Sequence, residues 1–255
     1  MIGRLKILFG LIELRANWIN ITMNKLFAWP LPLITLGNGI KFKLSNKRLK
    51  NLEVSIITEV WHQLCYNPPF FQIKDSDVVL DVGGNNGYFS IYAATLAKNG
   101  KVFVFEPVKK LFEAINNNII LNNINNVKAE NVAVAHEEKE NDFYIDDNNN
   151  GGHSLFNISN MAKTTKVMSI NLEKYCQRNG IEKINFLKMD CEGGEYEILL
   201  NAGRDFFTKI EKIAMEYHED IGEFKSDQLI TCLQDNDFIA VKSGSYIFAL
   251  NKNWL

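Results

Sequence analysis

The chain has 255 residues, 46% of them apolar and 23% charged, which suits a globular enzyme made of one large domain or a domain with a short extension. Its formal net charge of −2 excludes a global basic field that would gather nucleic acid, so we expect no nucleic-acid partner.

The cysteines are too far apart to form a C-x-x-C pair: Cys65, Cys176, Cys191 and Cys232. Such spacing indicates neither a zinc ribbon nor a disulfide framework. It fits a reducing compartment, and we expect a cytoplasmic protein.

The N-terminal segment contains an apolar run, residues 7–12, which Glu13 and Arg15 interrupt. The run is too short for a signal-peptide core of about 7–15 apolar residues or a membrane span of about 20. We expect no transmembrane segment and interpret the segment as an amphipathic helix packed on the domain, with weak peripheral membrane contact as the alternative. A basic run that follows is interpreted as a solvated face, although it could contact phosphates or anionic lipid: Lys41, Lys43, Lys47, Arg48 and Lys50.

Residues 1–74 are predicted to form an N-terminal extension of helices and a hairpin. Asn38-Gly39 indicates a hairpin turn between two apolar runs, since glycine readily adopts the positive φ of tight turns. A second helix is predicted from apolar residues at helical spacing, from Leu49 to Leu64. Asn67-Pro68-Pro69-Phe70 matches the N-P-P-aromatic loop of nucleic-acid and protein amide N-methyltransferases, but it follows a helix here and is interpreted as a helix stop.

From residue 75 to 255 the pattern predicts one α/β domain. Strands are predicted at 78–84, 101–107, 129–135, 184–190 and 212–218, alternating with helices at 88–98, 108–119, 171–179, 195–202 and 226–235. Residues 237–242 and 246–250 read as a C-terminal antiparallel hairpin. This alternation predicts a Rossmann-like fold with a mostly parallel seven-stranded sheet, whose ligands bind at the carboxyl ends of the strands.

Residues 136–170 interrupt the alternation with polar sequence. We interpret them as an irregular or hairpin insertion near the active site. Within it, His153 and Ser154 are candidates for a loop that covers the substrate.

The turn after the first core strand, Asp81 to Gly87, is the strongest functional signal. Its glycines let the backbone approach a ligand closely, and the helix that begins near Tyr88 offers free N–H groups. Gly83, Asn85 and Tyr88 occupy the three glycine positions of G-x-G-x-x-G, so a dinucleotide fingerprint is broken. The D-x-G-x-x-x-G pattern instead resembles motif I of class I methyltransferases. A structural glycine turn without a ligand is the alternative.

Glu106 ends the second core strand, where a carboxylate can accept both hydroxyls of a ribose. Both NAD and S-adenosylmethionine carry such a ribose, so Glu106 indicates an adenosine ligand without choosing between them. The resemblance to class I methyltransferases also implies that the end of the third strand flanks the adenine, which points to Glu130 and Asn131.

The catalytic candidates lie where the fourth and fifth strands end. Asp190 and Glu192 have period-2 spacing, as do Glu216 and His218, so each pair can project in one direction. His218 and Asp190 are the candidate bases, because a histidine with an ordinary pKa is available as a base at pH 7. Asp190, Glu216 and His218 could instead hold a divalent metal, although no spacing enforces coordination and none is predicted. Glu195 and Glu197 are placed to complement the start of the following helix.

The segments from residue 75 to about 250 together resemble the FkbM-type methyltransferases, a family that uses S-adenosylmethionine. The resemblance rests on VVLDVGGNNGYFSIYAA, KVFVFEP, NVAVA, GGHSL and above all FLKMDCEGGEYEIL, where Lys188 to Glu195 match K-[IM]-D-[VC]-E-G-x-E. It implies S-adenosylmethionine as methyl donor, framed by Asp81, Gly83 and Gly87, and O-methylation of a small molecule such as a sugar or secondary metabolite. The alternatives are an NAD-dependent oxidoreductase and a non-catalytic methyltransferase-like binding protein.

Overall fold

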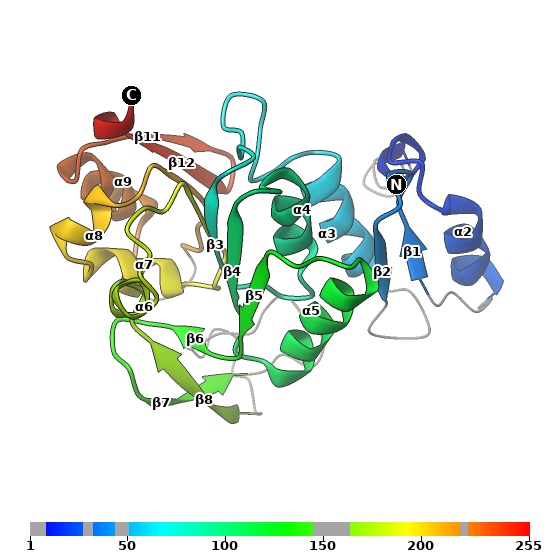
Figure 1. Cartoon of the computed structure of the whole chain (residues 1–255), viewed down its shortest axis with the longest axis horizontal. Helices are drawn as coiled ribbons and strands as arrows, with labels where there is room; N and C mark the ends of the chain where they lie inside the picture. The colour runs from blue at the N-terminus through cyan, green and yellow to red at the C-terminus, as the bar shows by residue number, and fades with distance from the viewer. Residues whose placement is uncertain (1–8, 28–32, 44–50, 145–163, 220–223) are drawn as a thin grey trace.

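The computed structural model describes residues 9–27, 33–43, 51–144, 164–219 and 224–255, and its elements are labelled in Figure 1. Residues 9–13 are helical. The other elements of the N-terminal part are α2 (Trp18–Phe27), β1 (Leu33–Thr35), β2 (Lys41–Lys43) and α3 (Asn51–Trp61). No helix in these ranges combines the length and apolar character needed to cross a bilayer.

A seven-stranded sheet forms the centre of the protein, with the strand order β11-β12-β10-β9-β3-β4-β5. The strands are β3 (Val78–Val82), β4 (Lys101–Phe105), β5 (Val127–Glu130), β9 (Phe186–Met189), β10 (Lys212–Glu216), β11 (Phe238–Ser243) and β12 (Tyr246–Asn251). The strands from β5 to β10 pair in parallel, whereas β12 is antiparallel to β10 and β11. This confirms the predicted fold class, including the C-terminal hairpin.

Helices cover both faces of this sheet, as Figure 1 shows. α4 (Tyr88–Leu96) and α5 (Lys109–Leu121) lie with α3 on one side. The other side carries α6 (Leu172–Arg178), α7 (Gly194–Leu200), α8 (Arg204–Thr208) and α9 (Ser226–Asp235). Neighbouring residues of a strand therefore enter different cores: Val79 packs in the first hydrophobic cluster and Leu80 in the second. Helices α2 and α8 were not predicted from the sequence.

The order of the strands sets the position of the ligand site. β4 and β9 both pair with β3 but on opposite sides, so the chain reverses its direction of progress through the sheet at β3. In open α/β sheets, such a switch point leaves a crevice at the carboxyl ends of the strands. The glycine turn follows β3 directly and therefore lies at this crevice.

The N-terminal part shares its hydrophobic core with the sheet. The predicted hairpin is confirmed, because β1 and β2 pair antiparallel around Gly39, which has a φ of 89°. Phe42 of β2 packs edge-on against Trp61 and Tyr88, with ring centroids 5.8 and 5.0 Å away. The division at residue 74 stays a prediction, and the packing is continuous across it.

The predicted helix end near the N-P-P segment is wrong. α3 ends at Trp61, and Leu64 has a φ of 55°, which a helix does not allow. Asn67 instead fixes the segment, because its Nδ2 donates to the Tyr92 hydroxyl at 2.9 Å and its Oδ1 accepts from the N–H of Ile73 at 2.7 Å. The segment therefore closes a loop rather than stopping a helix.

The third core strand is also shorter than predicted. β5 ends at Glu130, and the next strand, β6 (Ala133–Val134), pairs with β8 (Thr164–Ile170) in a separate sheet. The chain leaves the main sheet at Asn131, whose Nδ2 donates to the carbonyls of Glu106 and Pro107. β7 (Glu140–Tyr144) pairs antiparallel with β8, which confirms a hairpin in the insertion, whereas His153 and Ser154 lie outside the described residues.

Candidate active site

A cavity opens at the carboxyl ends of β3, β4, β9 and β10, where the sequence placed the site. Of the predicted residues, it is lined by Gly83, Asn85, Tyr88, Glu106, Asp190, Glu192, Glu216 and His218. α3 and the loop after it supply a further wall, formed by Leu52, Ile56, Glu59, Val60, Cys65 and Tyr66. The structure therefore brings all four catalytic candidates together and adds a wall from the N-terminal part.

The glycine turn is pressed against the end of β9. Gly83 has a φ of 82°, and a Cβ there would lie 1.8 Å from the carbonyl oxygen of Asp190. A Cβ on Gly84 would lie 2.2 Å from Cγ2 of Val104. Gly87 has a φ of 81° and immediately precedes α4. Gly83 and Gly84 thus permit a close approach of strands that any larger residue would prevent.

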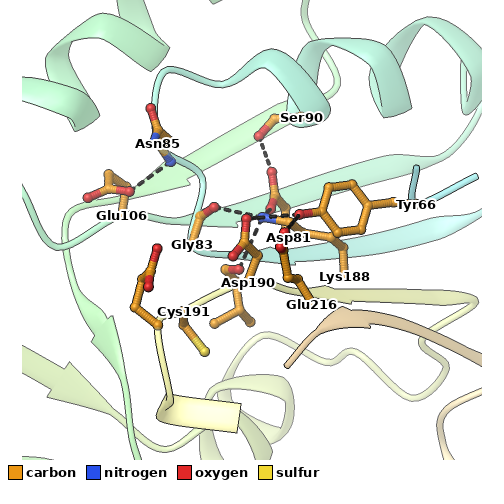
Figure 2. A network of polar contacts seen from close by, with 12 residues as sticks. Tyr66, Asp81, Gly83, Asn85, Ser90, Glu106, Lys188, Asp190, Cys191 and Glu216 are labelled. Atoms are coloured by element: carbon orange, nitrogen blue, oxygen red, sulfur yellow. Dashed lines mark hydrogen bonds and ion pairs between the residues drawn. The ribbon is translucent and has the colours of Figure 1, made fainter. Parts of the chain in front are cut away.

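Glu106 is fixed by the turn that it faces. Its Oε2 accepts from the N–H of Asn85 at 2.8 Å, and its Oε1 accepts from the N–H of Val108 at 2.9 Å (Figure 2 shows the first bond). Burial raises the pKa of Glu106 to about 7, although these two bonds oppose the shift. Glu106 therefore offers the cavity a pre-oriented carboxylate with few solvent contacts.

Glu130 and Asn131 do not line the cavity. Glu130 instead accepts from the Tyr175 hydroxyl and pairs with Lys128, both at 2.9 Å. Asn131 donates to backbone carbonyls of the neighbouring strand end. The cavity wall in this region is apolar and comprises Pro107, Leu111, Ala133, Val134 and Phe143.

Asp81 is fully buried and is also absent from the cavity wall. Its Oδ2 accepts from the Ser90 hydroxyl at 2.5 Å, and its Oδ1 lies 3.0 Å from Nζ of Lys188. Lys188 also donates to the carbonyl of Gly83 at 2.7 Å and lies 3.9 Å from Oδ2 of Asp190 (Figure 2). Asp81 thus positions Lys188, in contrast to the expectation that it frames the cofactor directly.

Lys188 is a buried cation that joins the glycine turn to β9. Burial would lower its pKa, but the carboxylates of Asp81 and Asp190 more than offset this, so the pKa is raised. Its side chain is only 4% exposed. The ammonium therefore stays charged beside Asp190 and holds the turn in place.

Tyr66 bridges two of the catalytic candidates. Its hydroxyl lies 2.9 Å from Oδ2 of Asp190 and 3.3 Å from Oε2 of Glu216 (Figure 2). Burial, followed by the charge of Asp190, raises the pKa of Glu216. The ring packs edge-on against Phe89 and Tyr246, which keeps the hydroxyl in this position.

The imidazole of His218 lies between the carboxylates of Glu192 and Glu195. Its Nε2 is 3.5 Å from Oε2 of Glu192, and its Nδ1 is 3.4 Å from Oε1 of Glu195. Burial would lower the pKa of His218, but Glu195 and Glu192 raise it to about 9. His218 is therefore protonated at neutral pH, which argues against its expected role as a base.

Glu195 and Glu192 shape the loop before α7. Glu195 is buried and accepts from the N–H groups of Cys191 and Gly193, at 2.8 and 2.9 Å. It thereby complements the helix start, as expected, and also faces His218. Burial raises the pKa of Glu192 to about 7, and the nearby imidazolium limits this shift.

Three groups at the acceptor side could hold a metal ion. Ligand atoms of Asp190, Glu192 and His218 all lie within 4.8 Å of one another. This set contains Glu192, whereas the sequence suggested Glu216 as the third ligand.

The sequence assigned no role in the site to Tyr66, Lys188 or Glu59, although Lys188 begins the segment that matches the FkbM pattern. Lys188 interrupts the apolar strand INFLKMD, and a lysine inside a buried strand is itself a signal of a partner carboxylate. Tyr66 and Glu59 carry no comparable signal, because only tertiary packing brings the N-terminal part over the sheet.

Comparison with known families gives a match to the methyltransferase FkbM domain over residues 81–240, which is more than half of the chain. Methyltransferase 1 of Beauveria bassiana is 23% identical over 207 residues, covering 73% of this chain and 82% of the relative. The 31-O-demethyl-FK506 methyltransferase FkbM of Streptomyces tacrolimicus is 22% identical, covering 75% of this chain and 84% of the relative.

Solved structures show more distant likenesses. An rRNA methylase from Streptococcus thermophilus has a TM-score of 0.44 at 16% identity, covering 71% of this chain and 89% of that one. TYW2 of M. jannaschii in complex with AdoMet has a TM-score of 0.41 at 14% identity, covering 83% and 78%.

Proposed function

Since the chain belongs to the FkbM methyltransferase family and is an S-adenosylmethionine-dependent methyltransferase, we propose that it methylates a hydroxyl group of a small molecule. The observation that carries this proposal is the carboxylate of Asp190, which lines the cavity beside Lys188 and Tyr66. The name of one relative, 31-O-demethyl-FK506 methyltransferase, specifies an O-demethyl compound, which supports oxygen as the acceptor atom.

The cavity residues fit an adenosyl ligand. Glu106 presents a fixed carboxylate that can accept hydroxyl hydrogens, and the glycine turn exposes backbone beside it. Leu111, Val134 and Phe143 line the same cavity and suit a flat heteroaromatic ring. When bound, S-adenosylmethionine supplies a methyl group on a positively charged sulfur. Gly83, Asn85, Tyr88 and Glu106 are the residues that we propose hold it, with Gly87 shaping the turn.

The Glu106→Gln variant tests this cofactor site. We expect a roughly 10- to 100-fold weaker affinity for S-adenosylhomocysteine, because a charged hydrogen-bond acceptor contributes about 1.5–3 kcal/mol. Glu130→Gln is the matched control, since Glu130 ends the adjacent strand but does not line the cavity. Calorimetric titration of both variants measures the difference. Equal affinities in the two variants would contradict the assignment of Glu106.

On the acceptor side, Asp190 is the group that we propose takes the hydroxyl proton. A base placed within hydrogen-bond reach increases the nucleophilicity of an alcohol as it attacks. Tyr66 and Lys188 hold the Asp190 carboxylate at the cavity wall, while the protonated His218 supplies positive charge nearby. Glu192 and Glu216 complete an acidic surface that orients the acceptor.

The acceptor atom can be tested with matched pairs of alcohols and amines. S-adenosylmethionine labelled on its methyl group is incubated with a panel of neutral methyl glycosides and the corresponding amino sugars. We expect labelled methyl ethers from alcohols, because the site supplies a base for a neutral nucleophile. Labelled N-methyl products from the amino sugars, with none from the alcohols, would overturn the proposed O-methylation.

The remaining alternatives are separated by measurement. The broken G-x-G-x-x-G pattern and the family match leave no support for an NAD-dependent oxidoreductase. A non-catalytic binding protein would hold S-adenosylhomocysteine without methyl transfer to any member of the panel. The expected cytoplasmic location stays a prediction.

A further inference from the structure

The outer side of helix α2 is apolar and exposed. Trp18, Ile19, Leu26 and Phe27 are all exposed, the last two at 68%. At about 100° per residue, Ile19, Leu26 and Phe27 project away from Ile21, which is buried against the core, whereas Trp18 lies about 60° from Ile21, at the border between the two sides. Helix α2 therefore buries one side and presents apolar side chains to solvent on the other, the reverse of an ordinary surface helix.

The preceding helical residues extend this apolar surface. Phe9 is 61% and Ile12 is 44% exposed, while Gly10 and Leu11 between them are buried. Six large apolar side chains are thus exposed within residues 9–27: Phe9, Ile12, Trp18, Ile19, Leu26 and Phe27. Isolated exposed apolar residues are normal, but such a concentration marks an interaction surface.

The same part of the sequence is strongly basic. Residues 1–50 contain nine lysines and arginines and one acidic residue, Glu13, so the rest of this chain of net charge −2 has a net charge of −10. Arg15, Lys41 and Lys43 are exposed. Along the sequence, positive charge is therefore concentrated in the same fifty residues that contain the exposed apolar side chains.

We propose that residues 9–13 and α2 form a docking surface for a bilayer of anionic phospholipids. Exposed aromatic and aliphatic side chains insert at the boundary between headgroups and acyl chains, and neighbouring basic residues are attracted to anionic headgroups. In Figure 1, α2 lies at the right-hand end of the molecule, beyond β1 and β2, where a flat surface can reach it. No helix in the described ranges could span a bilayer, so the contact is peripheral.

Charge favours a membrane over a second copy of the chain as the occupant. A twofold interface would place this basic segment against itself, and like charges repel. An anionic bilayer attracts the same charges and also accepts the apolar side chains. This inference is independent of the proposed methyl acceptor, because no residue of the docking surface lines the cavity.

The test is cosedimentation of the full chain with vesicles. We expect at least about tenfold stronger binding to vesicles of 30% phosphatidylserine in phosphatidylcholine than to phosphatidylcholine alone, and weaker binding in high salt. The double variant Ile19→Gln/Leu26→Gln removes two exposed apolar side chains. It should weaken binding to the anionic vesicles at least about tenfold.

The matched control is Ile120→Gln/Ile239→Gln, which removes two exposed isoleucines outside the N-terminal part. This control should bind vesicles as the wild type does. Absence of wild-type binding to anionic vesicles, or equal loss in both double variants, would overturn the proposal. Sedimentation equilibrium of the same proteins provides a second readout: dimers that Ile19→Gln/Leu26→Gln dissociates, without vesicle binding, would identify a second copy as the occupant.

Discussion

Gly83→Ala is expected to destabilise the folded protein by about 2–4 kcal/mol and to remove measurable S-adenosylhomocysteine binding. The added methyl would lie 1.8 Å from the carbonyl oxygen of Asp190, and the residue has a φ of 82°. The clashing oxygen belongs to the backbone of Asp190, which cannot rotate away as a flexible side chain could. The ends of β3 and β9 must therefore move apart to make room for the methyl group. This separation would move the glycine turn, Lys188 and Asp190 apart.

Gly244→Ala separates this clash from backbone strain alone. Gly244 has a φ of 61°, and a Cβ there has no heavy atom within 4 Å. We therefore expect a loss of only about 1–2 kcal/mol and unchanged cofactor binding. Urea unfolding measures both losses of free energy, and calorimetry measures binding. If Gly83→Ala were no more destabilising than Gly244→Ala, the close approach of β3 and β9 would be contradicted.

Asp190→Asn is expected to lower kcat by about 100- to 1000-fold while leaving S-adenosylhomocysteine affinity nearly unchanged. Asparagine keeps the size of the side chain and can still accept from Tyr66, but it cannot take a proton. A loss confined to kcat is therefore specific to the base. Steady-state rates with any alcohol that accepts methyl, together with calorimetric titration, separate the two effects.

Glu197→Gln is the control for Asp190→Asn. Glu197 lies in the first turn of α7, the helix that follows β9 and Asp190. Its side chain accepts from the N–H of His136 and does not line the cavity. Its kcat should match that of the wild type. Unchanged turnover in Asp190→Asn would remove Asp190 as the base.

The sequence predicted the parts of the site that depend on local backbone. Gly83 and Glu106 were identified because a strand that ends in glycine, followed about twenty residues later by a carboxylate, has a local meaning in an alternating α/β chain. Because β3 and β4 are adjacent parallel strands, their carboxyl ends, and with them Gly83 and Glu106, lie next to each other. Asp190, Glu192, Glu216 and His218 were predicted as a group for the same reason, and all line one cavity.

The sequence did not predict how the charges pair. Asp81 was expected to contact the cofactor, but its carboxylate forms an ion pair with the buried Lys188 of the neighbouring strand β9. His218 was expected as a base, but two glutamates raise its pKa to about 9. Such shifts depend on distances between segments far apart in the chain, which residue spacing does not contain. Tyr66 was missed for the same reason, since its loop reaches the site only after the N-terminal part packs on α4.

Calorimetric titration of the wild-type chain with S-adenosylhomocysteine, and separately with NAD, tests the cofactor assignment most directly. The account predicts saturable one-to-one binding of the first ligand and no detectable heat from the second. A folded protein that binds NAD, or that shows no affinity for S-adenosylhomocysteine, would contradict it.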